Sequence, residues 1–145
     1  YFAAIDLPGV LRQLDARLTL EMPVNHEADS LDQIQRQVEA LAGCATFVVV
    51  RNEVHGDSFA LYDRSLVRTT ILKKLGGKEI VMPRMESWLV EELNRLNLTP
   101  GAATSHEAFH LLDRQRLSTW RKRFYGQLDS ASVLLLPPAH IKCQP

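Results

Sequence analysis

The sequence of 145 residues is long enough for one domain with its own hydrophobic core. Apolar residues make up 46% of the chain and charged residues 23%, which excludes disordered, collagen-like and low-complexity proteins. Lys plus Arg and Asp plus Glu each number 17, so the chain lacks the excess positive charge that drives non-specific nucleic-acid binding. No apolar stretch approaches the ~18 residues of a membrane helix. The two cysteines, Cys44 and Cys143, are too few for a disulfide framework and indicate a cytoplasmic protein.

Apolar patterning predicts strands that alternate with helices along the whole chain. The expected strands are residues 1–5, 17–24, 47–50 and 80–82, and the expected helices are residues 10–16, 31–43, 66–75, 88–96 and 105–128. This order predicts one α/β domain over residues 1–145, with a mainly parallel sheet of about four strands, flanking helices on both faces and a long C-terminal helix. Because Tyr1 opens into an apolar strand without a Met, we expect this domain to be the later part of a larger protein.

Polar segments follow three of the expected strands directly, and they begin at Asp6, Asn52 and Pro83. In parallel sheets ligands bind outside the carboxyl ends of the strands, so these segments are the candidate site. Asp6 and Gly9 form D-x-x-G, in which a carboxylate can hold Mg²⁺ and a glycine N–H can approach a phosphate; the alternative is a plain turn. Asn52 either pairs with a purine edge or makes an ordinary loop hydrogen bond. Pro83 either shapes the loop beside this pocket or simply ends the strand.

The segments FAAIDLPG, FVVVRN and EIVMPR, in this order, resemble the later part of a ParA/MinD-type P-loop ATPase. That group includes ATPases of plasmid partition and conjugal DNA mobilisation. The resemblance implies a P-loop NTPase-like fold, a nucleotide-dependent homodimer, and ATP with Mg²⁺ in the intact protein. It assigns Mg²⁺ coordination through water, and thereby the catalytic role, to Asp6, and sensing of the γ-phosphate to Gly9. It assigns adenine contact to Asn52 and packing along the base to Pro83 and Arg84.

The sequence departs from this family at the phosphate-binding loop, which is absent. Residues 75–79 contain two glycines and a lysine, but they precede a strand, whereas a phosphate-binding loop connects a strand to a helix. In the family the loop precedes the D-x-x-G segment, so we expect it upstream of Tyr1. ATP hydrolysis is then expected of the intact parent protein, and this chain alone is expected to bind ATP weakly or not at all.

A rival motif, H-E-x-x-H, occupies His106, Glu107 and His110 on the expected final helix. Two histidines four residues apart on a helix can bind zinc, with the glutamate as base on the metal-bound water, which would make the protein a metallopeptidase. A third ligand would have to be Asp113, His140 or an upstream residue. The alternative is a solvated helix face, on which both histidines and Asp113 point outward while Phe109 and Leu112 point inward.

The expected final helix is also locally basic. Its cationic residues are Arg114, Arg116, Arg121, Lys122 and Arg123, and they accompany Trp120 and Phe124. This cluster is either a solvated face or a contact surface for DNA or an anionic partner protein. No membrane partner is expected.

Overall fold

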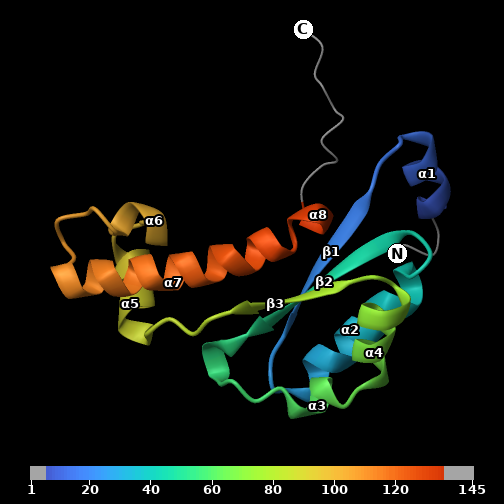
Figure 1. Ribbon diagram of the computed structural model, residues 1–145, viewed down its shortest axis with the longest axis horizontal. Coiled ribbons are helices and arrows are strands. Elements are labelled where there is room, and N and C mark those ends of the chain that lie inside the picture. The colour runs from blue at the N-terminus through green and yellow to red at the C-terminus, as the bar shows by residue number, and fades with distance from the viewer. Residues whose placement is uncertain (1–5, 136–145) are drawn as a thin grey trace, which may run out of the picture.

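A computed structural model describes residues 6–135, with only the backbone described at His55. Three strands, β1 (Leu18–Val24), β2 (Ala45–Asn52) and β3 (Lys78–Met82), form a parallel sheet in the order β1-β2-β3 (Figure 1). The register pairs Leu20 with Phe47 and Val50 with Ile80. The α/β class and the parallel sheet are therefore confirmed. The strand expected over residues 1–5 lies outside the described residues.

The central strand β2 is buried on both faces. Phe47, Val48 and Val49 are each 0% exposed, and their side chains alternate between the two sides of the sheet. A strand that is apolar on both faces requires a layer of helices on each side. Helices cover both faces of the sheet, as expected, and they form two layers.

The first layer contains α2 (Ala28–Leu41), α3 (Ala60–Asp63), α4 (Leu66–Thr69) and the π-helical turn η3 (Thr70–Lys74). Helix α2 buries Ile34, Val38 and Leu41, which recur at helical spacing and pack with Phe47 and Val49 in one core. Two expected helices are thereby confirmed, although α2 begins slightly earlier than expected. Its N-cap is Glu27, which makes no side-chain capping bond.

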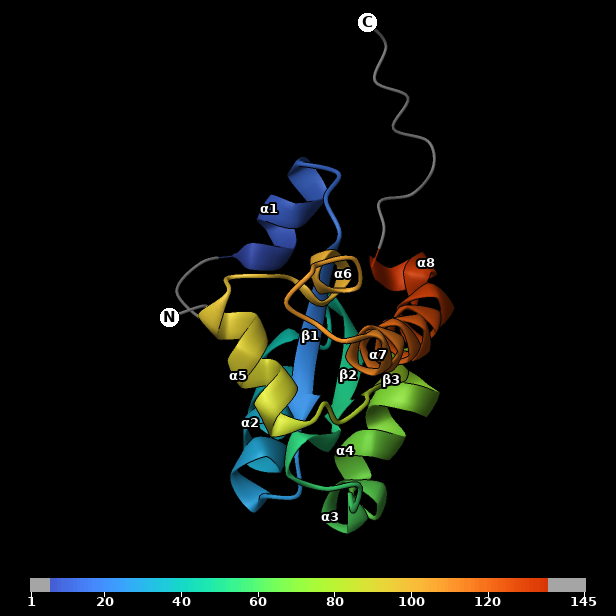
Figure 2. The same cartoon turned by 90° about the vertical axis from the view of Figure 1, so that its left-hand side faces the viewer.

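The second layer consists of α7 (Leu111–Ser130) and α8 (Ser132–Leu135). Val48 and Ile80 from the sheet form a core with Ala131, and Phe124 and Leu128 of α7 pack against it. Only the C-terminal half of α7 takes part in this core. The N-terminal half extends beyond the end of β3 (Figures 1 and 2).

Beyond β3, the start of α7 forms a helical unit with α5 (Ser87–Arg95) and α6 (Pro100–Ala103). This unit has its own core, which consists of Leu89, Leu93, Ala103, Phe109 and Leu117. The short helix α6 lies between the expected helices 88–96 and 105–128, in a segment for which the sequence predicted no helix. Helix α7 therefore joins the helical unit to the sheet.

The expected start of the final helix is wrong, because α7 begins at Leu111 and not at Ser105. The Ser105 hydroxyl donates back to the carbonyl of Ala102 instead of capping a following helix. Residues 104–110 form turns, which insert Phe109 into the core of the helical unit, where it is 3% exposed. Leu112, expected on the inner face, is 71% exposed because the helix starts after this insertion.

Two short helices complete the described chain: α1 (Leu7–Gln13) before β1 and the 3₁₀ turn η2 (Glu53–His55) after β2. Within residues 6–135, none of the helices combines the length and the hydropathy required to cross a bilayer.

Candidate functional site

Two of the three expected strand ends meet at one edge of the sheet. The β2–β3 register places Asn52 directly beside Met82, so Asn52 and Pro83 lie together at the edge where the strands end. We call this the carboxyl edge. The Oδ1 atom of Asn52 accepts a hydrogen bond from the backbone N–H of Val54 at 3.0 Å, which caps η2. Its Nδ2 amino group has no hydrogen-bond partner within the described part of the chain.

Pro83 is buried, and its carbonyl oxygen accepts the indole N–H of Trp120 at 2.7 Å. This bond attaches α7 to the segment that follows β3. The next residue, Arg84, is exposed and forms no ion pair among the described residues. The structure therefore brings Asn52 together with Pro83, whereas Arg84, the third residue to which the resemblance assigns base contact, is not among the residues that line the cavity described next.

A largely apolar cavity of about 480 Å³, here called the edge cavity, opens between the carboxyl edge and the helical unit. On the sheet side it is bounded by Val54, Met82 and Pro83, and Trp120 of α7 closes it on a further side. Its remaining lining comes from the segment after β3 and from α5 and α6: Met85, Ser87, Val90, Glu91, Leu93, Asn94, Leu98 and Pro100. The volume lies within the range of small-molecule sites. Asn52 does not line the cavity, but it pairs with the lining residue Met82 and precedes the lining residue Val54 by two positions in the sequence.

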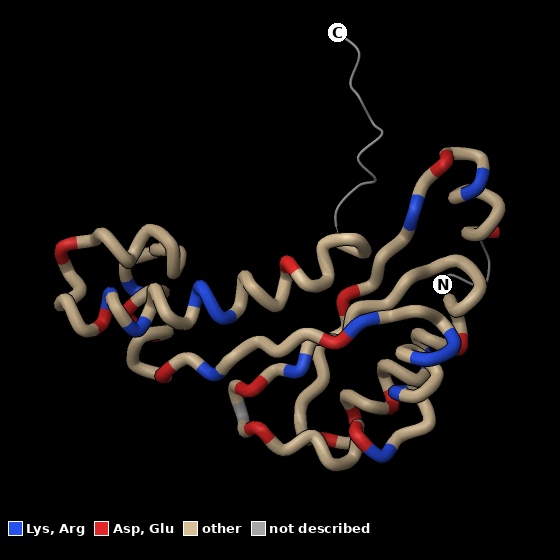
Figure 3. The backbone as a smooth tube through the Cα atoms, viewed as in Figure 1, with Lys and Arg blue, Asp and Glu red and all other residues tan. Residues whose placement is uncertain are grey.

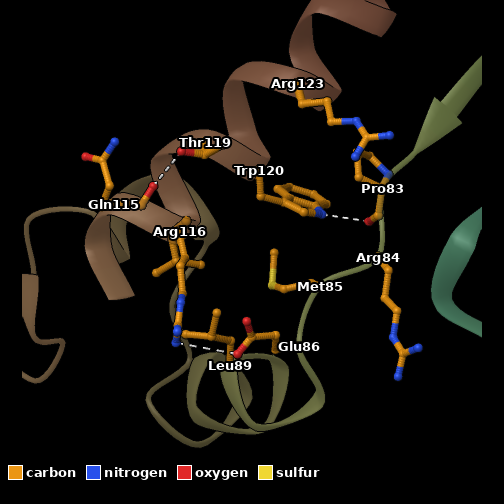
Figure 4. A pocket seen from close by; sticks show the side chains of 11 residues that line it. Pro83, Arg84, Met85, Glu86, Leu89, Gln115, Arg116, Thr119, Trp120 and Arg123 are labelled. Atoms are coloured by element: carbon orange, nitrogen blue, oxygen red, sulfur yellow. Dashed lines mark hydrogen bonds and ion pairs between the residues drawn. The ribbon is translucent and has the colours of Figure 1, made fainter. Parts of the chain in front are cut away.

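A second pocket of about 320 Å³ lies between the segment after β3 and α7 (Figure 4). We call it the arginine pocket because Arg84, Arg116 and Arg123 line it, together with a single carboxylate, that of Glu86. Pro83, Met85 and Trp120 line both this pocket and the edge cavity, so they form the wall between the two. From the sequence, Trp120 was named only as a companion of the basic cluster, and its place in the lining of a pocket was not predicted.

Asp6 and Gly9 lie elsewhere in the fold. The Oδ1 atom of Asp6 accepts a hydrogen bond from the backbone N–H of Gly9 at 3.0 Å and thereby caps α1. A Cβ atom at Gly9 would lie 2.1 Å from Oδ2 of Asp6, so the glycine permits this close approach. The adjacent Pro8 borders a hollow with Gly43 and Cys44, which precede β2. The D-x-x-G segment therefore lies near the amino end of β2 and is not beside Asn52 (Figure 1).

The glycine-lysine segment before β3 has a packing role. A Cβ atom at Gly77 would lie 2.7 Å from the carbonyl oxygen of Phe47 and 2.5 Å from a methyl carbon of Ile71. The absence of a side chain thus allows η3 to lie close to β2. The ammonium group of Lys78 donates to the carbonyl of Ser130 at the end of α7. The glycine-lysine segment precedes β3 and does not connect a strand to a helix, as the sequence predicts.

The H-E-x-x-H segment is not helical, which corrects the prediction that placed it on the final helix. The Nδ1 atom of His106 accepts a hydrogen bond from the backbone N–H of Ala108 at 3.2 Å, as in a local turn. Glu107 and His110 are exposed, and His110 is the residue that precedes α7. Within residues 6–135, no three His, Cys, Asp or Glu side chains are grouped to hold a metal ion. His140, another potential ligand, lies outside the described residues.

The basic residues of α7 are partly engaged within the chain. Arg114 donates to the carbonyl of Phe109 at 2.8 Å and so holds the inserted turn. Arg116 lies 3.6 Å from carboxylates of Glu86 and Asp113. Lys122 and Arg123 are exposed, and Figure 3 shows Lys and Arg gathered in the middle of α7. The helix therefore combines a role in packing with a solvated cationic surface.

A network of four charges, which sequence reasoning missed, connects the sheet to α3 and α4. Arg68 binds the Glu79 carboxylate with contacts of 2.8 to 3.2 Å, and this hydrogen bonding raises the pKa of Arg68. Arg51 lies 3.0 Å from Asp63 and 3.6 Å from Glu79. The parallel register pairs Val49 with Glu79, so Arg51 and Glu79 are diagonal neighbours on one face of the sheet, a relationship that the strand boundaries alone do not give.

The Tyr62 side chain lies beneath this network. It is 1% exposed, and its hydroxyl has no hydrogen-bond partner within the described part of the chain. Burial raises the pKa of Tyr62 above its ordinary value, and the negative charge of Glu79 adds to the shift.

Comparisons with protein-family models, with curated proteins and with solved structures find no match to this chain. The functional interpretation therefore depends on the geometry of the carboxyl edge and on the sequence resemblance.

Proposed function

We propose that this chain is the later part of a ParA/MinD-type ATPase and that its carboxyl edge recognises the adenine of ATP. The observation that carries the proposal is the pairing of Asn52 with Met82, which places an amide donor without a partner among the described residues beside the segment that starts at Pro83. The edge cavity next to them supplies apolar walls of the kind that hold a flat base. The order of the strand-end motifs, FVVVRN then EIVMPR, supports the same proposal.

The proposal assigns base recognition to this chain and phosphate chemistry to the intact parent. The 145 residues contain no phosphate-binding loop that connects a strand to a helix, and Asp6 is committed to capping α1. When bound in the parent, Mg²⁺ would neutralise charge on the phosphates. The biological role that goes with the proposal is ATP-dependent plasmid partition or conjugal DNA mobilisation by a cytoplasmic homodimer. Contact of the basic helix α7 with DNA or with a DNA-binding protein belongs to this role.

The test is saturation-transfer NMR of ATP and GTP with the 145-residue chain. This method detects weak binding, and weak binding is expected because the phosphate-binding loop is absent. The base protons of ATP are expected to receive saturation more strongly than those of GTP. The variant Asn52→Asp keeps the oxygen that caps η2 but removes the amino donor, so it should abolish the preference for ATP.

Two controls make the test specific. Gln13→Glu changes an exposed amide on α1, near the amino end of the sheet and away from the edge cavity, and should leave the ATP signal unchanged. A direct titration should give an affinity for ATP weaker than about 1 μM, because most nucleotide affinity comes from contacts with the phosphates. Equal saturation of ATP and GTP, or an unchanged preference in Asn52→Asp, would contradict the proposal.

A further inference from the structure

The arginine pocket has a regular pattern on one helix. Arg116, Trp120 and Arg123 are spaced four and three residues apart, so they lie on the same face of α7. This face is directed toward the segment after β3, and Figure 4 shows the three side chains along it, with Met85 opposite Trp120. Two guanidinium groups thus flank one aromatic ring.

The two flanking guanidinium groups keep donors available for a ligand. Arg116 is 3.6 Å from its nearest carboxylates, and Arg123 is 3.9 Å from Glu53. These distances exceed those of charged hydrogen bonds, and both guanidinium groups are more than half exposed, so solvent screens the pairs. Arg84, the third arginine of the lining, has no ion pair within the described residues. The lining of the pocket thus carries three guanidinium groups and the carboxylate of Glu86, while the carboxylates of Asp113 and Glu53 lie outside the lining.

The floor of the pocket is apolar and held in place. Met85, Leu89 and Leu117 line it, and Leu89 and Leu117 belong to the buried core of the helical unit. The Trp120 ring is held by its hydrogen bond to Pro83 and by Phe124, whose ring centre is 5.3 Å away. A flat group that enters the pocket therefore meets a preformed surface, so little ordering is required on binding.

The geometry points to a binding site for a small organic anion in the arginine pocket. Its phosphate or carboxylate group is held by the guanidinium group of Arg116 or of Arg123, each of which can donate two parallel hydrogen bonds, and its flat apolar body lies against Trp120 and Met85 between them. The site is separate from the proposed adenine site, because Pro83 and Trp120 form the wall between the arginine pocket and the edge cavity. The inference therefore does not depend on the proposed function.

The experiment uses Trp120 as the reporter. Trp88 and Trp120 are the two tryptophans of the chain, so the variant Trp88→Phe leaves Trp120 as the single fluorophore. Phenyl phosphate, which carries both a charge and a flat ring, is the probe. It should change the Trp120 emission in a saturable manner. Phenol carries only the ring and inorganic phosphate only the charge, so the affinity of each should be lower than that of phenyl phosphate by at least about tenfold.

Matched variants decide whether the arginines hold the anion. In the Trp88→Phe background, the double variant Arg116→Gln/Arg123→Gln should weaken phenyl phosphate binding about tenfold or more. The control double variant Arg36→Gln/Arg64→Gln removes the same charge from exposed positions on α2 and after α3, and it should leave the affinity unchanged. Asn52→Asp should also leave it unchanged, which separates this site from the adenine site. Equal weakening in both double variants, equal binding of phenol, or no saturable change with phenyl phosphate would overturn the inference.

Discussion

The indole N–H of Trp120 donates to the carbonyl oxygen of Pro83 at 2.7 Å, and this bond connects the long helix α7 to the carboxyl edge of the sheet (Figure 4). Proline has no N–H to offer, so its carbonyl is the backbone group through which this position can be held. The edge cavity and the arginine pocket use the two residues as a shared wall. A change at this bond should therefore affect the stability of the fold and the shape of both pockets.

Replacing Trp120 with Phe should lower the free energy of unfolding by about 1–2 kcal/mol, because it removes the hydrogen bond and part of the buried ring while keeping an aromatic group. Urea denaturation followed by far-UV circular dichroism measures the change. Trp88→Phe is the control, because Trp88 is 44% exposed and its indole donates to the exposed Glu86. This substitution should change the free energy of unfolding by no more than about 0.5 kcal/mol. Equal losses in the two variants would show that the bond to Pro83 contributes nothing specific.

Tyr62 should make the protein sensitive to alkaline pH. The folded state raises the pKa of this hydroxyl, whereas the unfolded chain titrates it near its ordinary value of about 10. The stability that depends on neutral Tyr62 is therefore complete below about pH 10 and is lost as the pH rises from there toward the folded-state pKa. Tyr62→Phe removes the ionisable group and should flatten this loss. Denaturation at about pH 8 and about pH 11 measures it.

The same substitution tests the unpartnered hydroxyl. Because the buried Tyr62 oxygen has no partner within the described residues, Tyr62→Phe should leave the stability near neutral pH unchanged or raise it by about 1 kcal/mol. Tyr125→Phe, at a ring that is 54% exposed, should change neither the neutral nor the alkaline value. A clear loss of stability in Tyr62→Phe at neutral pH would mean that the hydroxyl has a hydrogen-bond partner after all.

The strands and the main helices could be predicted from the sequence because their signals are local. The run Phe47 to Val50 and the spacing of Ile34, Val38 and Leu41 reflect burial that each element requires on its own. The meeting of Asn52 with Pro83 was also predictable, because parallel strands end at a common edge. The start of α7 was not predictable. The spacing of Phe109 and Leu112 indicates a helix, but Phe109 instead inserts into a core that α5 and α6 build, and the helix begins only after it.

The candidate site was predictable only where it follows strand ends. The wall formed by Trp120 and Pro83 joins residues 37 positions apart, and no local pattern indicates that bond. The D-x-x-G pattern is shared by a helix cap and a phosphate site, and the structure uses it as a cap. Sequence spacing alone does not distinguish these two uses, because both need a carboxylate that approaches a glycine N–H.

The capping role of Asp6 predicts a difference between two substitutions. Asp6→Ala should destabilise α1 by about 1 kcal/mol, whereas Asp6→Asn should retain most of the stability because an amide oxygen can also accept the Gly9 N–H. Amide hydrogen exchange over Leu7–Gln13 measures the effect locally, since α1 buries none of its residues fully. If Asp6 instead coordinates Mg²⁺ in the intact parent, both substitutions should abolish Mg²⁺-dependent ATP hydrolysis there, and Asp6→Asn would then behave like Asp6→Ala.

Zinc content separates the ATPase proposal from a metallopeptidase. The His106 ring accepts a local backbone N–H, and the segment that carries it forms turns, so the two histidines do not share a helix face. A catalytic zinc site needs three protein ligands. We therefore expect protein purified without chelator to contain no stoichiometric zinc, as measured by elemental analysis, and His110→Ala to leave the metal content unchanged. One zinc per chain that disappears in His110→Ala would instead favour the peptidase.

Glu107→Gln, at an exposed position, should alter the free energy of unfolding by no more than about 0.5 kcal/mol. A large loss of stability in this variant would show that the Glu107 side chain is buried and paired.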